Sequence, residues 1–364
     1  MKSRGFVPLT RAIGFGSLPT VVDVRAGERA LMRAFAEVGL PFELTRNVET
    51  PIPSGAMVEL FDRCAHILGD RTFGLDIGLG MERRAYGLWG QYGLLAPTLG
   101  NAIERYIATS WAQQVGASLE LVWRGDHWLW RSVLPGVSDD NRAHTDHLIH
   151  PMLGAVRTYL GPDWMPEWIE VNYARDPDAG KLEDRLGVPI RYGRPWLGLV
   201  LNPADLTRGR HPAYDDEMTD IVLRDVLADV VMPEASEPAR SLSAVVGLRL
   251  LEGKTDIEGA ARLAHLSVQG LQRQLRKKGY TYRELVDRAR MTRAITLLRD
   301  SDVSIIEVAL SLGYEDHASF TRAFNRWVGC APIAFRKAKQ AGPFLRHVPS
   351  SAADPDVLFA NGSP

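Results

Sequence analysis

Glutamine and arginine side chains recur in two segments near the C-terminus, and these residue types read the edges of DNA bases. The first segment carries Gln269, Gln272 and Arg273, and the second carries Arg322. Glutamine makes bidentate hydrogen bonds to adenine in the major groove, and arginine makes them to guanine. The chemistry that these residues indicate is sequence-specific recognition of duplex DNA. Taken singly, each polar residue is equally explained by a solvated helix face, and the two arginines by a structural ion pair.

The two segments, 255–279 and 304–329, are near-copies of each other. In both, an Ile precedes an Ala by four residues, and an apolar residue stands two before an Arg and four before another apolar residue. The spacing between these two parts is one residue longer in the second copy. This repeat predicts two helix-turn-helix units, each with a short helix, a tight turn and a recognition helix.

Each recognition helix is expected to bury an apolar stripe and to expose its polar positions. The first, 268–277, has two Leu at i and i+4, and the second, 317–328, has Phe320, Phe324 and Trp327. The candidate DNA-binding residues are Ser267, Gln269, Gln272, Arg273, Arg276, His317, Ala318, Ser319, Arg322 and Arg326. Much of the salt-dependent affinity is expected from phosphate contacts by Lys254, Arg262, Lys277, Lys278, Arg290 and Arg326.

Capping patterns predict where the helices of this region begin. Capping boxes are expected at Thr255 with Glu258, Thr281 with Glu284, and Ser304 with Glu307. Ser267 and Asp316 are the expected N-caps of the two recognition helices. Gly313 stands in the second turn, where the backbone must be left-handed, and His265 tolerates the same place in the first turn at some cost.

One long helix is expected between the two copies, over 282–299. At 1.5 Å per residue it spans about 27 Å, and successive major grooves on one face of DNA lie about 34 Å apart. A rigid helix of this length could place the recognition helices in neighbouring grooves. The alternative is that it only packs the two helix-turn-helix units together, which it must do in any case.

Charge is divided unevenly along the chain. Residues 240–340 carry 18 Lys and Arg against 10 Asp and Glu, a formal charge of +8. The whole chain carries −1, so the remaining residues carry −9. A basic segment on an acidic body indicates that one end meets a polyanion.

Composition excludes several classes of protein. The apolar content of 45% and the charged content of 24% are those of a soluble globular protein. No run is apolar enough for a membrane span, and the N-terminus lacks the apolar core of a secretory signal. We therefore expect a cytoplasmic protein whose two cysteines, Cys64 and Cys330, are buried, reduced thiols.

The N-terminal body mixes helical and strand periodicities, which predicts an α+β fold. Helices are expected over 28–38, 55–68, 99–113 and 141–160, with a shorter helical segment over 182–186. Strands are expected over 118–123 and 127–134, as a hairpin, and over 168–173 and 197–201.

Aromatic residues of this body are candidates for a ligand pocket, because aromatic side chains line apolar binding sites. The candidates are Trp89, Tyr92, Trp111 and Trp123. Packing in an ordinary core is the alternative for each of them. Trp128 and Trp130 share one face of the hairpin, which favours packing together over separate roles.

Three histidines, His144, His147 and His150, stand at i, i+3 and i+6 of a predicted helix. The first two could share a metal ion, but the third lies about 240° further round the helix than the first. The Glu that a zinc hydrolase motif requires is missing. We therefore expect solvated or hydrogen-bonded histidines and no metal or other cofactor.

The C-terminal residues 242–338 resemble the DNA-binding domain of the AraC/XylS family of bacterial transcription regulators. The resemblance is most specific from Ser304 through Gly313-Tyr314 and Ala331-Pro332 to Phe335-Arg336. It implies base contacts by Gln269, Gln272 and Arg273 from the first recognition helix, and by His317, Ala318, Ser319 and Arg322 from the second.

Residues 72–115, and more weakly those to about 215, are similar to the arabinose-binding-like effector domain of ornithine-utilisation regulators in this family. The residues that carry this likeness are Phe73-Gly-Leu-Asp-Ile-Gly, Gly87-Leu-Trp-Gly, Ala96-Pro-Thr-Leu-Gly-Asn-Ala and Gly187-Val-Pro-Ile-Arg-Tyr-Gly. The likeness implies an α+β sensor domain for a small molecule and contacts between two copies.

The expected organisation is an α+β effector and dimerisation domain, 1–232, a linker, 233–241, an all-α domain of two helix-turn-helix units joined by a long helix, 242–340, and a disordered tail, 341–364. The expected partners are double-stranded promoter DNA, a small-molecule effector, a second copy of the chain and RNA polymerase. Two alternatives remain open. One is a regulator whose N-terminal domain only dimerises, and the other is a metal-dependent enzyme fused to a DNA tether.

Overall fold

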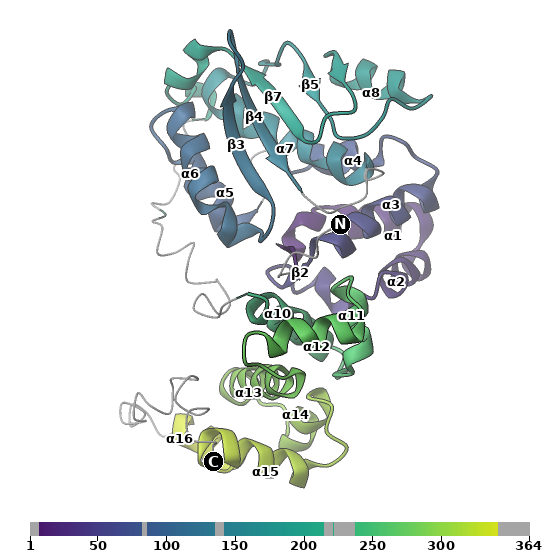
Figure 1. Ribbon diagram of the computed structural model, residues 1–364, viewed down its shortest axis with the longest axis vertical. Helices are drawn as coiled ribbons and strands as arrows, with labels where there is room; N and C mark the ends of the chain where they lie inside the picture. The colour runs from purple at the N-terminus through teal and green to yellow at the C-terminus, as the bar shows by residue number, and fades with distance from the viewer. Residues whose placement is uncertain (1–6, 82–85, 135–141, 215–220, 222–236, 341–364) are drawn as a thin grey trace. The chain divides into compact units, whose positions relative to one another are not determined.

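The structure, a computed structural model, describes residues 7–81, 86–134, 142–214, 221 and 237–340 (Figure 1). It divides into two compact units. The N-terminal unit runs to Ser241 and includes Leu263–His265, and the C-terminal unit contains the other residues from Leu242 onward. The tail expected to be disordered, 341–364, lies outside the described residues.

The predicted linker, 233–241, is only partly described, and its last three residues are helical. They form the first turn of α10 (Ala239–Leu250). Ser241 is completely buried, and its hydroxyl accepts a hydrogen bond from the Val7 N–H at 3.0 Å. The linker prediction therefore extends too far, because an Ala-Arg-Ser sequence with no helix breaker continues the helix backwards to Ala239.

The first part of the N-terminal unit combines helices with a small antiparallel sheet. Its elements are β1 (Leu9–Arg11), α1 (Leu18–Ala26), α2 (Glu28–Glu37), β2 (Pro51–Pro53), α3 (Ser54–Leu68) and α4 (Phe73–Leu79). In α2 the residues Leu31, Ala34 and Phe35 recur at helical spacing and are buried. Helix α3 ends where Gly69 adopts a left-handed backbone, with φ of 60°.

The second part is a five-stranded sheet of order β3-β4-β7-β5-β6 (Figure 1). The strands are β3 (Ser118–Trp123), β4 (Trp128–Val133), β5 (Ile169–Glu170), β6 (Ile190–Arg191) and β7 (Leu197–Leu201). The predicted hairpin is confirmed, with Leu121 opposite Trp130. The predicted strand over 168–173 is longer than β5, although backbone hydrogen bonds to the neighbouring segment 191–194 continue beyond Glu170 at Val171 and Tyr173.

The helices of this part are α5 (Gly87–Leu94), α6 (Leu99–Gln113), α7 (Arg142–Leu160) and α8 (Ala179–Leu186). Helix α7 packs against β7, and α6 packs against β3. Trp130, Tyr106 and Tyr159 belong to the apolar core that these elements share. Trp128 is partly buried against the same core, and its ring also contacts that of Trp123 on the edge strand, with centroids 5.3 Å apart.

Helices α4 and α7 touch through their backbones. A Cβ atom added at Gly74 would collide with the carbonyl oxygen of Ala143, and one added at Gly78 would collide with that of His147. Both glycines have ordinary helical geometry, so they are needed for close approach and not for a positive φ. The sequence Gly74-Leu-Asp-Ile-Gly78 thus places α4 directly on the main chain of α7.

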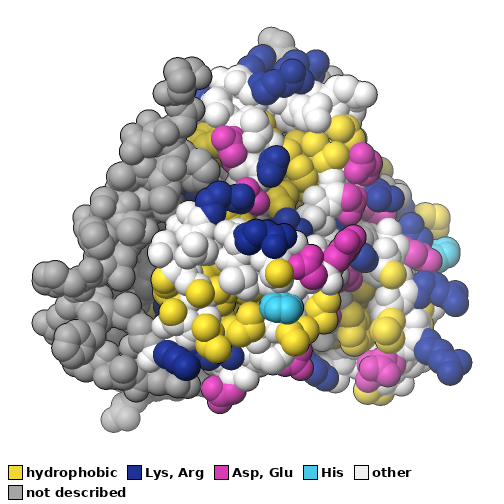
Figure 2. Space-filling view, turned by 90° about the horizontal axis from the view of Figure 1, so that it is seen from below, with side chains coloured by type: hydrophobic (Ala, Val, Ile, Leu, Met, Phe, Trp, Pro, Cys, Tyr) yellow, Lys and Arg dark blue, Asp and Glu magenta, His cyan; other side chains and the backbone are white. Residues whose placement is uncertain are grey.

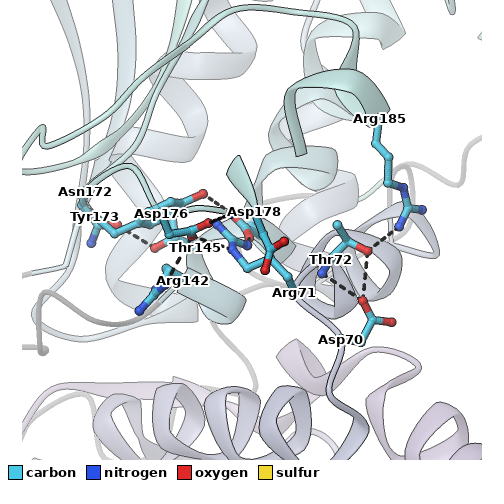
Figure 3. A network of polar contacts seen from close by, with 11 residues as sticks. Asp70, Arg71, Thr72, Arg142, Thr145, Asn172, Tyr173, Asp176, Asp178 and Arg185 are labelled. Carbon is cyan, nitrogen blue, oxygen red and sulfur yellow. Dashed lines mark hydrogen bonds and ion pairs between the residues drawn. The ribbon is translucent and has the colours of Figure 1, made fainter. Parts of the chain in front are cut away.

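A network of polar side chains fixes α7 to the segments beside it (Figure 3). The carboxylate of Asp146, which is completely buried, accepts hydrogen bonds from Arg71 at 2.5 Å and from the Tyr173 hydroxyl. Arg71 also donates to Asp176 at 2.7 Å, and Arg142 donates to the same carboxylate at 3.3 Å. Burial raises the pKa of Asp146 to about 6, against the opposing charge of Arg71.

The C-terminal unit is entirely helical in its described residues. After α10 come α11 (Ile257–Leu263), α12 (Val268–Arg276), α13 (Tyr282–Asp300), α14 (Ile305–Ser311), α15 (His317–Val328) and α16 (Pro332–Gln340). Phe320, Phe324 and Trp327 of α15 pack with Leu298 and Val308 in one core. The predicted long helix and both helix-turn-helix units are confirmed.

Two of the three predicted capping boxes are confirmed, at Thr281 with Glu284 and at Ser304 with Glu307. The third prediction is wrong, because Asp256 and not Thr255 caps α11. The Asp256 carboxylate accepts a hydrogen bond from the Gly259 N–H at 2.8 Å. Aspartate is the stronger cap, and the Thr255 hydroxyl instead accepts a hydrogen bond from Arg290 at 3.4 Å.

Two expectations from composition can be compared with the fold. Neither cysteine is in a disulfide; Cys64 is buried, as expected, whereas Cys330 is partly exposed. Burial raises the pKa of the Cys64 thiol to about 12, so this thiol is un-ionised. Within the described residues, every helix is too short or too polar to cross a membrane.

Candidate functional site

The exposed face of α12 presents the first set of candidate DNA-binding residues. Ser267 caps the helix by accepting a hydrogen bond from the Gly270 N–H at 3.0 Å. Leu271 and Leu275 are completely buried, which turns the opposite side of the helix outward. The exposed residues on that side are Gln269, Gln272, Arg273 and Arg276.

The start of α15 presents the second set through a chain of hydrogen bonds. Asp316 caps the helix, accepting from the Ser319 N–H at 2.7 Å and from the Ser319 hydroxyl at 2.7 Å. Arg322 in turn donates to the Ser319 hydroxyl oxygen at 2.9 Å. The hydrogen bonds from Ser319 hold the pKa of Asp316 below its usual value. His317 and Ala318 are exposed beside this chain.

The turns before these helices are left-handed where the sequence predicted it. Gly313 has φ of 72° and His265 has φ of 52°. Arg290, predicted to contact phosphate, instead holds the second turn, because its guanidinium donates to the Leu312 carbonyl at 2.8 Å and to the Gly313 carbonyl at 3.1 Å. The same guanidinium lies 4.4 Å from the centre of the Tyr314 ring.

The structure groups the candidates into two surfaces of the C-terminal unit. A shallow depression on α12 is lined by Gln269, Arg273, Arg276 and Lys277. A groove between α13 and α15 includes Ser319, Arg322 and Arg326 among its lining residues. Arg326 is partly engaged, since it pairs with Asp287 of α13 at 3.3 Å. Figure 2 shows basic side chains in several separate groups, with acidic side chains between them.

A cavity of about 100 Å³ lies in the N-terminal unit. It is lined by residues from β1, α3, α5, α6, β3, β4 and α7 and from the segments beside them. Of the four aromatic candidates, only Trp89 lines it. Tyr92 lies beneath Arg105, 4.8 Å from ring centre to guanidinium, while Trp111 and Trp123 are each 45% exposed on the surface. The structure therefore does not bring the four candidates together.

Several buried polar atoms around this cavity have no hydrogen-bond partner among the described residues. They are Ser54 Oγ, Tyr86 OH, Gln113 Nε2, Trp130 Nε1 and His147 Nε2. The first three were not predicted to be functional residues, because they come from separate segments that the fold brings together. Their spacing along the chain carries no signal that could have identified them.

Two of the three predicted histidines lie in the cavity wall, and neither is solvated. His144 and His147 are buried, with ring centroids 4.9 Å apart, and His147 is hydrogen-bonded through Nδ1 to the His144 carbonyl at 2.7 Å. His150 is half-buried and is not part of the lining. Among the described residues, no cluster of three His, Cys, Asp or Glu side chains could hold a metal ion.

Burial keeps both cavity histidines neutral. It lowers the pKa of His147 to about 4 and, together with the neighbouring His147, holds that of His144 well below its usual value. A carbonyl oxygen can only accept, so the Nδ1 of His147 carries its proton. The Nε2 atom of His147 therefore faces the cavity as a hydrogen-bond acceptor.

We expect the contribution of His147 to the stability of the N-terminal unit to be lost as the pH falls from about 6.5 to about 4, whereas Asp146, whose pKa is raised to about 6, acts in the opposite direction. The unfolded chain protonates its histidines near pH 6.5, whereas folded His147 resists protonation down to about pH 4. Protonation at low pH therefore favours the unfolded chain. The contribution of His147 to the free energy of unfolding is about 3 kcal/mol lower at pH 4 than above pH 6.5. Urea unfolding across this pH range measures the slope.

Comparison of two variants isolates the contribution of His147 to the pH dependence of stability. His147→Phe preserves the stacking on Phe61, whose ring centroid is 4.4 Å away, and is expected to remove the His147 share of about 3 kcal/mol from the pH dependence while leaving the shares of His144 and Asp146. His66→Gln removes an exposed histidine of α3 and is expected to leave the dependence as it is. Equal slopes for the wild type and His147→Phe would show that His147 is not held neutral.

Two family models match the chain. Residues 30–209 match the arabinose-binding domain of AraC transcription regulators, and residues 260–338 match a helix-turn-helix domain. The chain is 27% identical over 290 residues to the ornithine utilization regulator of Pseudomonas aeruginosa, covering 75% of this chain and 80% of that protein. It is also 38% identical over 78 residues to the regulator VqsM of the same organism, covering 21% of this chain and 24% of that protein.

Solved structures give a comparison with low overall scores. The transcriptional regulator CdpR from Pseudomonas aeruginosa matches 85% of this chain and 97% of its own, with 22% identity and a TM-score of 0.38. The DNA-binding domain of AdpA, solved in complex with a target DNA, matches 28% of this chain and 93% of its own, with 32% identity and a TM-score of 0.25.

The two family models follow each other along the chain in the order of the two units, the first over the α+β part and the second over the helix-turn-helix region. A family of regulators, and not of enzymes, accounts for both. The chain is thus a member of the AraC family of DNA-binding transcription regulators, with an arabinose-binding-like effector domain at its N-terminus.

Proposed function

We propose that this regulator reads two successive major grooves of promoter DNA, inserting the start of α12 into one and the start of α15 into the next. The observation that carries the proposal is the chain from Asp316 through Ser319 to Arg322, which directs a guanidinium outward at the helix start. A second exposed Gln and Arg face, on α12, belongs to the same compact unit. Arginine and glutamine at such positions discriminate guanine and adenine.

The spacing of the two helices supports this reading. Helix α13, Tyr282–Asp300, joins the two helix-turn-helix units and has 19 residues, which correspond to about 28 Å of helix. Arg290 of α13 donates hydrogen bonds to the Leu312 and Gly313 carbonyls in the turn of the second helix-turn-helix, which makes the connection stiff there. This length is close to the distance of about 34 Å between successive grooves on one face of the duplex.

We infer that the protein acts in the cytoplasm as a dimer and that its N-terminal unit binds a small molecule. The DNA-bound dimer would contact RNA polymerase at the promoter. A ligand can change the affinity for DNA only if it favours one conformation of the regulator over another. The unpaired polar atoms of the cavity support a ligand-controlled regulator over one whose N-terminal unit only dimerises.

Arg273→Ala and Arg322→Ala are each expected to weaken binding to the preferred duplex by about 1–3 kcal/mol. Each should also relax the preference at particular base pairs, because a bidentate contact to guanine is lost. The preferred duplex is selected from a random-sequence library with the full-length protein. Binding of each variant to this duplex and to its single-base variants is then measured at one fixed salt concentration.

Arg29→Ala is the matched control, since it removes an exposed arginine from α2 of the N-terminal unit. It should leave both affinity and base preference unchanged. Uniform weakening on every duplex would make Arg273 or Arg322 a phosphate contact and not a base reader. Failure of the wild type to enrich any sequence would overturn the proposed function.

A further inference from the structure

We propose that the cavity of the N-terminal unit is the effector site and that its ligand is a compact, uncharged, amphipathic molecule carrying a hydroxyl group and a carbonyl or similar acceptor. This inference rests on the proposed function, because it names the chemistry of the effector that the regulator would sense. It follows from the size of the cavity, the residues of its wall and the polar atoms left unpaired there.

The size of the cavity limits the ligand to a small molecule. A buried water needs about 10–15 Å³ of such space, so a cavity of about 100 Å³ has room for about seven to ten non-hydrogen atoms. Its walls are largely apolar and aromatic: the Tyr106 ring is stacked on that of Trp130, with centroids 6.1 Å apart, and is tilted against that of Trp89, with centroids 5.0 Å apart. A flat apolar body therefore fits the wall better than a sugar, whose surface is mostly hydroxyl.

The charge of the wall excludes an ionic ligand. Among the residues that the structure describes, those lining the cavity include no Lys, Arg, Asp or Glu. The two histidines in the wall are neutral, as shown above by their burial. An ammonium or carboxylate group would lose its hydration here without gaining an opposite charge, which is strongly unfavourable. An amino acid, charged at both ends, is therefore a poor fit.

The unpaired atoms define which polar groups the ligand must carry. Gln113 and Trp130 are 6% and 3% exposed, and each has a buried N–H that lacks an acceptor. A carbonyl or ether oxygen on the ligand would accept from them. His147 is 1% exposed and offers Nε2 as an acceptor, so it requires a ligand O–H or N–H. A hydroxyl supplies this donor without adding charge.

Ser54 and Tyr86 add two hydroxyl groups to the same wall, and neither has a partner within the described residues. Buried polar groups are nearly always hydrogen-bonded, so several unpaired groups around one cavity need an explanation. A ligand that pairs them all at once would explain why the fold keeps them, since unpaired groups lower the stability of the empty protein.

The experiment uses the full-length protein and four probes in calorimetric titration at pH 7. The neutral probes are 4-hydroxyacetophenone, which has both polar groups on one ring, and acetophenone, which lacks the hydroxyl. The charged probes are 4-hydroxybenzoate, similar in size, and L-ornithine. We expect 4-hydroxyacetophenone to bind at least tenfold more tightly than each of the others. Equal or tighter binding of either charged probe, or no binding of 4-hydroxyacetophenone at millimolar concentration, would overturn the proposal.

Two variants then test the polar contacts. Gln113→Leu keeps the size of the side chain but removes its N–H, so affinity for 4-hydroxyacetophenone should fall about tenfold. Because an unpaired buried group is also removed, the melting temperature of the ligand-free protein should not fall, and we expect a rise of about 2–4 °C. His147→Phe should lower the affinity similarly by removing the acceptor. Unchanged affinity in both variants would overturn the proposed contacts.

Trp128→Phe is the matched control for Trp130→Phe, because both lie on β4 and only Trp130 lines the cavity. Only the second change should weaken binding of 4-hydroxyacetophenone. Affinity for the selected DNA duplex is measured without any probe in the same preparations. If the wild-type protein bound the selected duplex no better than its single-base variants, the proposed function would fail. The probe titrations decide the chemistry of the cavity separately.

Discussion

Gly74→Ala is expected to lower the free energy of unfolding of the N-terminal unit by about 3 kcal/mol. The added methyl group would collide with the carbonyl oxygen of Ala143, which belongs to the backbone of α7 and cannot turn aside as a side chain would. Helix α4 must then move away, which opens gaps along its contact with α7. Urea unfolding followed by tryptophan fluorescence measures the loss. Gly78→Ala should behave similarly, because its methyl group meets the carbonyl of His147.

Gly180→Ala provides the control for this result. Gly180 also lies in a helix of the N-terminal unit, α8, but a Cβ atom added there meets no other atom within 4 Å. Alanine favours the helix over glycine, so this variant should be unchanged or more stable by up to about 1 kcal/mol. If Gly74→Ala and Gly180→Ala proved equally stable, close approach of α4 and α7 would not be a requirement of the fold.

Arg71→Met is expected to cost about 3–5 kcal/mol of stability, which makes it the most damaging single change in the polar network of Figure 3. Asp146 is completely buried, and within the described parts of the chain its one remaining hydrogen-bond donor would be the Tyr173 hydroxyl. Asp176 would also lose its 2.7 Å hydrogen bond from Arg71, although Arg142 remains beside it. Chemical unfolding at pH 7 measures this cost.

The double variant Arg71→Met with Asp146→Asn separates charge from packing. Asparagine is neutral and still offers an oxygen to the Tyr173 hydroxyl, so the double variant should be more stable than Arg71→Met alone. A double variant that is less stable by the sum of the two single losses would show that Asp146 and Arg71 do not interact energetically.

Much of the C-terminal unit could be predicted from the sequence, because its signals are local. The helix starts at Ser267, Thr281, Ser304 and Asp316 depend on side chains within three residues of the amides they cap. The buried stripes of α12 and α15 depend on spacing within one helix. One local signal was ambiguous, since Thr255 and Asp256 both suit a cap and only their competition decides between them.

The cavity could not be predicted, because it depends on residues that are distant in sequence. Gln113, Trp130 and His147 come from three different elements, and nothing in their sequence neighbourhoods marks them as partners. The clustering of aromatic residues in the sequence predicted a pocket role for Trp89, which lines the cavity, but also for Trp111 and Trp123, which lie on the surface. The role of Arg290 was equally hidden, since a basic residue in a DNA-binding region indicates phosphate until the carbonyl groups it holds are known.

The two helices proposed to read DNA, α12 and α15, differ in how firmly their arginines are held. Arg322 is already restrained by its hydrogen bond to Ser319, whereas Arg273 makes no side-chain hydrogen bond to any described residue. A restrained side chain loses less rotational freedom when it docks, and a free one can adjust to more than one base. We therefore expect base changes in a promoter to be tolerated in the groove that α12 would enter and to weaken binding in the groove that α15 would enter. New target promoters would then differ from old ones mainly in the bases that face α12.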